Sequence, residues 1–170
     1  MVLLSKMVVA TLLLIGTLGA TVWLHASPRP IPNDVESNEK VLREKLVGSW
    51  KIVSASFDGK PSELHRTSIT IKHITPVHIL WIGYQPEDRR IFRSSGGAWT
   101  IQDGRYVETM RYGIGDKFKE DTFGKSFAFD CRFQDDQWIQ SGKMPNGVFL
   151  EEIWKRVQEN EDVDSWPTGN

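Results

Sequence analysis

Apolar and polar residues alternate along the chain from Gly48 onward, as they do in strands that bury one face. The runs are rich in Val, Ile, Thr and aromatic residues, which favour strands. The predicted strands are residues 49–57, 68–74, 77–83, 90–93, 98–102, 106–112, 126–134, 138–143 and 149–157. Asp58-Gly59, Asp103-Gly104 and Asn146-Gly147 lie between such runs and are strong hairpin signals. About eight short strands joined by tight turns predict antiparallel pairing of neighbours, in either a closed barrel or a sandwich.

The segment before these strands has the spacing of a helix. Apolar positions recur every three to four residues through residues 35–46, Asn33 or Asp34 can cap the start, and Gly48 ends the run. This pattern predicts a short amphipathic helix at the entrance of the barrel. Residues 27–32 contain three prolines, so they predict an extended spacer.

The first 24 residues are apolar and carry one charge, Lys6. A short positive region followed by such a run is typical of a secretory signal or of a membrane anchor, and the sequence leaves both open. Either one predicts an exported, extracytoplasmic or periplasmic domain, which an uncleaved segment would tether to the membrane. The expected organisation is a signal or anchor over residues 1–26, a Pro-rich linker over 27–34, the barrel with its helix over 35–157 and an acidic disordered tail over 158–170.

Charge and cysteine content exclude several functions. The formal net charge is −1, from 21 Lys and Arg against 22 Asp and Glu, so the chain lacks the basic character of nucleic-acid-binding proteins. The single cysteine, Cys131, excludes an internal disulfide and a cysteine-based metal cluster. The histidines and carboxylates form no zinc motif, so we expect no metal and no cofactor.

Alternation also assigns the faces of individual strands. Phe127, Phe129, Cys131 and Phe133 share one face, while the charged residues between them share the other, which predicts the aromatic face inside. In residues 106–112 the face with Tyr106, Met110 and Tyr112 is the expected interior, and it brings Glu108 inside. For Glu152 the alternation is ambiguous, because both faces of its strand carry a carboxylate.

Gly48-Ser49-Trp50 opens the first strand after the helix, and Arg156 closes the last one. With the phrases at residues 46–60, 74–84, 96–101 and 141–157, this pattern resembles the lipocalin (calycin) family, in particular an uncharacterised bacterial group that is exported or membrane-anchored. The resemblance implies an all-β, antiparallel up-and-down barrel of about eight strands. It also implies that Trp50 packs near Arg156 at the closed end. It transfers no catalytic or ligand-binding residues.

The interior of such a barrel predicts a binding site with aromatic walls and a few polar groups. The candidate ligand-binding residues are His78, Trp81, Trp99, Tyr106, Glu108, Tyr112, Gln140 and Glu152. The predicted function is binding of a small, mostly apolar molecule without catalysis. A cavity above about 300 Å³ would support it. A filled interior would favour the alternative, an envelope module that interacts with other proteins through its outer face.

Glu108 is the most informative candidate, because a buried carboxylate needs a partner or a proton. The sequence leaves open whether it is paired for structural reasons, anchors a ligand, or has a raised pKa for acid–base chemistry. An enzyme based on Glu108, or on haem bound by His78, is a third and weaker alternative, since no other residues complete a catalytic set.

Overall fold

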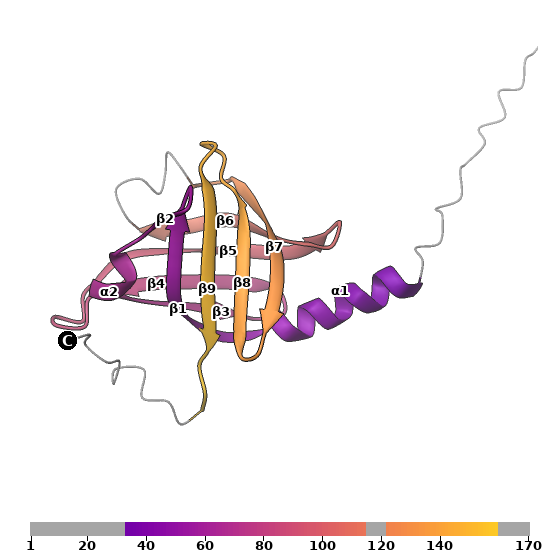
Figure 1. Cartoon of the computed structure of the whole chain (residues 1–170), viewed down its shortest axis with the longest axis horizontal. Coiled ribbons are helices and arrows are strands. Elements are labelled where there is room, and N and C mark those ends of the chain that lie inside the picture. The colour runs from indigo at the N-terminus through magenta and orange to yellow at the C-terminus, as the bar shows by residue number, and fades with distance from the viewer. Residues whose placement is uncertain (1–32, 115–121, 160–170) are drawn as a thin grey trace, which may run out of the picture. The chain divides into compact units, whose positions relative to one another are not determined.

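The fold is a closed antiparallel β-barrel, seen in a computed structural model that describes residues 33–114 and 122–159. The eight barrel strands are β1 (Gly48–Phe57), β3 (Ile69–Ile74), β4 (His78–Tyr84), β5 (Ile91–Gln102), β6 (Arg105–Ile114), β7 (Ser126–Gln134), β8 (Gln137–Lys143) and β9 (Phe149–Arg156). Each pairs with its neighbour in sequence, and β9 pairs with β1 to close the sheet. In Figure 1 β1, β9, β8 and β7 cross in front of β3 to β6. The predicted all-β up-and-down barrel is confirmed.

The two Asp-Gly turns have the conformation that their sequences predict, whereas at Asn146-Gly147 only the glycine has a positive φ. Asp58 and Gly59 have φ values of 50° and 75°, and Asp103 and Gly104 have 52° and 72°. Positive φ at both central residues is the mark of a type I′ turn, which matches the twist of a hairpin. The Asp103-Gly104 turn therefore fixes the register of β5 with β6.

The residues predicted as two strands, 90–93 and 98–102, form the single strand β5. The Gly96-Gly97 pair between them lies where β6 comes closest: a Cβ on Gly97 would be 2.0 Å from the Thr109 carbonyl oxygen. The register shifts at this point, since Gly97 pairs with Met110 and Gly96 with Tyr112. Arg111 is thus an extra residue in β6, a bulge, and the glycines continue the strand past it.

Two short elements follow β1 that the alternation did not predict. They are β2 (Lys60–Pro61), which pairs with the end of β1, and the single helical turn α2 (Leu64–Thr67). They carry the chain from β1 to β3 at the end of the barrel away from Gly48.

The predicted helix is present as α1 (Asn33–Leu46), so the last two residues of the expected linker belong to it. Its position differs from the prediction of an entrance helix. Leu46 is fully buried, and its carbonyl accepts a hydrogen bond of 2.8 Å from the Trp50 indole at the start of β1. The helix therefore joins the filled end of the barrel, because its last turn is fixed to the first residues of β1.

The predicted signal or anchor, residues 1–26, and most of the acidic tail lie outside the described residues. Within residues 33–114 and 122–159, no helix is both long and apolar enough to cross a membrane.

Candidate functional site

Arg156 covers Trp50 where β1 begins. Its guanidinium carbon lies 4.1 Å from the centre of the indole ring, and its Nη1 donates to the Val47 carbonyl at 3.0 Å. Gly48 leaves room for this, because a Cβ there would be 2.3 Å from Arg156 Nη1. This is the arrangement that the lipocalin resemblance implies. It combines a cation–π contact with hydrogen bonds that shield the end of the core from water.

Aromatic rings fill the half of the barrel next to Trp50. Trp138 is central: its ring centre lies 5.4 Å from those of Trp50 and Tyr106 and 6.1 Å from that of Trp154. All four side chains are almost completely buried. We call these four residues the aromatic plug. These buried rings pack against one another and occupy this half of the interior.

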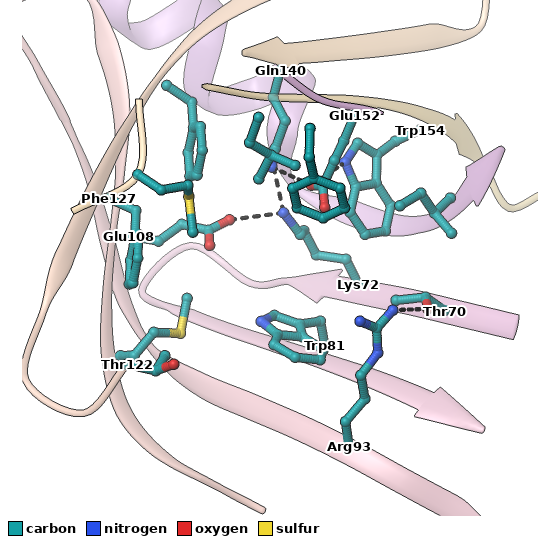
Figure 2. Close-up of a pocket in the computed structure, with 16 residues that line it drawn as sticks. Thr70, Lys72, Trp81, Arg93, Glu108, Thr122, Phe127, Gln140, Glu152 and Trp154 are labelled. Carbon is teal, nitrogen blue, oxygen red and sulfur yellow. Dashed lines mark hydrogen bonds and ion pairs between the residues drawn. The ribbon is translucent and has the colours of Figure 1, made fainter. Parts of the chain in front are cut away.

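A buried polar chain lies against the aromatic plug. The Lys72 ammonium is 2.8 Å from Glu108 Oε1 and 3.1 Å from Gln140 Oε1, and it lies 4.4 Å from the centre of the Trp154 ring (Figure 2). Lys72, Glu108 and Gln140 are 2%, 4% and 1% exposed. The carboxylate, the amide and the ring faces together replace the water that the ammonium loses on burial.

Glu152 extends this chain into β9. Its Oε2 accepts hydrogen bonds from Gln140 Nε2 at 2.5 Å and from Trp154 Nε1 at 3.2 Å. Burial raises the pKa of Glu152 above its ordinary value, and the nearby Lys72 ammonium acts against that rise. Glu152 Oε1 accepts no hydrogen bond within the described residues, so it is free to accept one from a ligand.

The other half of the barrel holds a cavity of about 200 Å³ that is partly open to solvent. It lies where β1 ends and β9 begins, since Phe57 and Leu150 are in its wall. Its apolar wall also contains Ile52, Trp81, Met110, Phe127, Phe129, Met144 and Trp154. Its polar groups are Thr70, Lys72, Arg93, Glu108, Thr122, Gln140 and Glu152 (Figure 2). The volume falls short of about 300 Å³, the size that would support the predicted ligand binding, and the aromatic plug occupies the other half of the interior.

A wider and shallower hollow of about 370 Å³ lies outside the barrel, between Arg43 of α1 and Trp99. The Arg43 guanidinium carbon lies 5.0 Å from the centre of the Trp99 ring. The hollow offers one opposite charge, Glu44, beside that arginine, and it lacks the converging polar groups of the interior.

Four of the eight predicted site residues lie together in the cavity wall: Trp81, Glu108, Gln140 and Glu152. Two others are buried elsewhere in the core. Tyr106 belongs to the aromatic plug, and Trp99 lies near α1 with its Nε1 donating to the Thr75 carbonyl at 2.7 Å. Burial raises the pKa of Tyr106 well above its ordinary value, and the Glu108 carboxylate adds to the rise. The phenol therefore stays protonated.

The last two candidate residues, His78 and Tyr112, are exposed and lie outside the cavity; the sequence left the face of His78 open, and for Tyr112 this corrects the expected inward placement. His78 alternates with the fully buried Ile79 and faces outward. Tyr112 is 50% exposed because the bulge at Arg111 reverses the alternation after Met110. Its ring lies over Gly96 on the outside, where a Cβ would be 2.5 Å from the ring. The simple period of two assigned Tyr112 to the wrong face for this reason.

Sequence reasoning missed Lys72 and Arg93, the two cations of the cavity. In β3 both faces are buried, since Ile69 and Ile71 are nearly as inaccessible as Lys72, so alternation does not show which face is inside. A useful signal was the isolated lysine among isoleucines, which requires a buried counter-ion. For Arg93, the split of β5 into two predicted strands left its face unassigned.

Replacing Glu152 by glutamine is expected to change how stability depends on pH. Because folding raises the pKa of Glu152 from 4.5, the carboxyl contributes stability below about pH 4.5 that is lost as the pH rises through the raised value. The free energy of unfolding of E152Q relative to the wild type should therefore increase from pH 4 toward pH 8, measured by urea denaturation. A constant difference between the two proteins across this range would contradict the shift.

In comparisons with known proteins, this chain is similar only to solved structures of barrels. No family model matches the sequence, and no curated protein matches it. Three similar structures are the tryptamine complex of the amine binding protein of Rhodnius prolixus, a redesigned beta barrel and the fluorescent protein UnaG. Sequence identities are 13%, 15% and 17%, and TM-scores are 0.43, 0.44 and 0.35. The matches cover 68%, 68% and 67% of this chain, and 65%, 95% and 98% of the other chains.

This chain thus spans less than two thirds of the amine binding protein. The class of the protein, a closed eight-stranded antiparallel up-and-down barrel, follows from the strand pairing above. Its function has to be argued from the cavity.

Proposed function

We propose that the barrel binds a small, largely apolar molecule in the cavity beside Trp81 and Glu152. The observation that carries the proposal is the composition of the cavity wall. Aromatic and aliphatic side chains surround a few polar groups, and some of these have unused hydrogen-bonding capacity. Apolar walls supply binding energy at about 25 cal/mol per Å² of buried surface, while the polar groups orient one end of the ligand.

The size of the cavity limits the ligand. At about 200 Å³ it is smaller than the pockets that hold drug-sized molecules, so we expect a ligand well below that size. The aromatic plug sets this limit, because its rings occupy the space between the cavity and α1. The cavity could extend toward α1 only if smaller side chains replaced these rings. Among the described residues, no three His, Cys, Asp or Glu side chains are placed to hold a metal together.

Native mass spectrometry of the full-length protein, purified from its own source, tests the proposal. We expect a second mass that corresponds to the protein with one small molecule, which solvent extraction then releases. Repeated purification of the protein with no added mass, together with no binding of small aromatic probes, would contradict the proposal.

A pair of tryptophan variants provides a matched control. In L150W the new ring enters the cavity, because Leu150 is in its wall, and the added mass should be lost. In I153W the same ring is added to the same strand on the outward-facing side, since Ile153 alternates with the inward Glu152 and Trp154. The added mass should remain in I153W. Loss of the ligand from both variants would place the binding site outside the cavity.

The N-terminal residues add a proposal about location. The uncharged apolar run in residues 7–24, preceded by Lys6, supports export of the barrel across a membrane. Fusion of residues 1–34 to a reporter enzyme that is active only outside the cytoplasm tests this, with Leu12→Arg, L13R and L14R combined as the control that removes the apolar run.

A further inference from the structure

We infer that the ligand of the cavity carries one carboxylate, which Arg93 binds at the open end. This inference rests on the proposed function and names the chemistry of the ligand. It concerns a side chain that the sequence pattern did not single out and that the polar chain around Lys72 does not use.

The position of Arg93 is built into the barrel. It is on β5, paired with Gly83 of β4, and its side chain lies across that glycine: a Cβ on Gly83 would be 2.8 Å from Arg93 Nε and 2.9 Å from its Cγ. Gly83 therefore leaves the space in which the arginine extends toward Trp81, whose ring centre is 5.5 Å from the guanidinium carbon. Figure 2 shows Arg93 at one side of the cavity, with Trp81 beside it.

No carboxylate of the described residues lies within ion-pair distance of Arg93, and the Glu152 carboxylate in the same cavity wall attracts its guanidinium only from farther away. Arg93 Nη2 donates to Thr70 Oγ1 at 3.1 Å, which is a neutral partner, and its buried Nε has no hydrogen-bond partner among the described residues. Lys72, the other cation of the cavity, has its carboxylate at 2.8 Å. A buried donor without an acceptor is costly, because water is removed from it and nothing replaces that water. Among the described residues, the cavity therefore lacks an acceptor for Arg93 Nε.

A ligand carboxylate would supply that acceptor. The guanidinium presents its donors in a flat fork that matches the two oxygens of a carboxylate, which allows two parallel hydrogen bonds. The guanidinium has enough donors for a phosphate group as well, but a carboxylate adds only one negative charge to a cavity that already contains Glu108 and Glu152, so it fits better. The body of the ligand would then lie against Trp81, Met110 and Phe127 in the apolar wall.

A cationic ligand fits the cavity less well. Its anionic partner would be Glu152 Oε1, because Oε2 already accepts two hydrogen bonds. The face of Trp154, the nearest ring for a cation–π contact, is already occupied by the Lys72 ammonium at 4.4 Å. A second ammonium in this region would meet the charge of Lys72.

Three probes that share a phenylpropyl group and differ in the end group test the inference: 3-phenylpropionate, 3-phenylpropanol and 3-phenylpropylamine. Isothermal titration calorimetry on the full chain at pH 7 should show that 3-phenylpropionate binds at least about tenfold more tightly than the alcohol, because hydrogen bonds to a charged group are the stronger ones. The amine should bind more weakly than the alcohol. Inorganic phosphate, which lacks the apolar body, should show no binding.

Arg93→Gln removes the charge and keeps most of the side chain. R93Q should therefore bind 3-phenylpropionate and 3-phenylpropanol with about equal affinity. Arg90→Gln is the matched control. Arg90 is three residues before Arg93, and its exposed side chain pairs with Asp88. R90Q removes the same charge, and the preference for 3-phenylpropionate should persist. Circular dichroism and the melting temperature establish that R93Q is folded, and we expect its melting temperature to be no lower than that of the wild type.

The outcomes separate this inference from the proposed function. If the wild type binds the acid and the alcohol equally, or if R93Q keeps the preference for the acid, the inference of a carboxylate ligand is wrong. The proposal that the cavity is a binding site would still stand. Tightest binding of the amine, lost in E152Q, also overturns it and indicates an ammonium ligand at Glu152. If none of the three probes binds and the native protein carries no ligand, the proposed function itself fails.

Discussion

Replacing Glu108 by leucine is expected to lower the free energy of unfolding by about 3–5 kcal/mol, since it leaves the Lys72 ammonium buried without its anion. Lys72 is only 2% exposed and lies 2.8 Å from the carboxylate. The ring faces of Trp138 and Trp154 and the Gln140 amide remain as uncharged partners, and the Glu152 carboxylate remains nearby but outside ion-pair distance. Equilibrium denaturation by urea measures the loss.

The double variant K72M/E108L should recover most of that loss, because apolar side chains of similar size replace both charges. The exposed pair of Arg132 with Glu151, at 3.8 Å, provides the control. Glu151→Leu should change the free energy of unfolding by at most about 1 kcal/mol, as is usual for pairs at the surface. An E108L variant as stable as E151L would show that the buried ion pair contributes little.

Truncating the centre of the aromatic plug is the second large effect that we expect. Trp138→Ala should lower the free energy of unfolding by about 3–5 kcal/mol, because it removes a fully buried indole and leaves a void that the rigid barrel cannot close. The substitution also removes the contacts of that ring with Trp50, Tyr106 and Trp154, and the hydrogen bond of 3.2 Å from its Nε1 to Cys131 Sγ.

Trp81→Ala is the matched comparison, because Trp81 is partly exposed and borders a space that is already hollow. Water can enter the enlarged cavity there, so the loss in W81A should be clearly smaller than in W138A. Thermal or urea unfolding of both variants checks the order. Equal losses would contradict the division of the interior into a filled half and a hollow half.

The sequence predicts most of the fold because local chemistry and global shape agree. The alternation in β7 places Phe127 and Phe129 inside, and the Asp103-Gly104 turn fixes the hairpin of β5 with β6. The prediction fails where a tertiary feature overrides the period of two. The bulge at Arg111 turns Tyr112 outward, and it depends on the close approach of Gly97 to β6, which no local pattern reveals.

The candidate site is predictable only in part, for a related reason. Glu108 stands out as a carboxylate on an aromatic face, but its partner Lys72 is 36 residues away on a strand whose two faces are both buried. Pairing across the interior depends on barrel closure and on side-chain length. The sequence therefore indicates that a buried charge needs a partner, and the structure identifies that partner.

The pairing of β1 with β9 has a consequence for how the chain is made. Arg156 donates a hydrogen bond to the Val47 carbonyl, 109 positions earlier, so the ring of strands cannot be completed until nearly the whole barrel has left the ribosome. Until then β1 and β8 each present an unpaired edge, which invites association with other nascent chains. Contacts between such distant positions also slow folding. The arrival of the final strand should therefore be the event that commits the newly synthesised polypeptide to its native form.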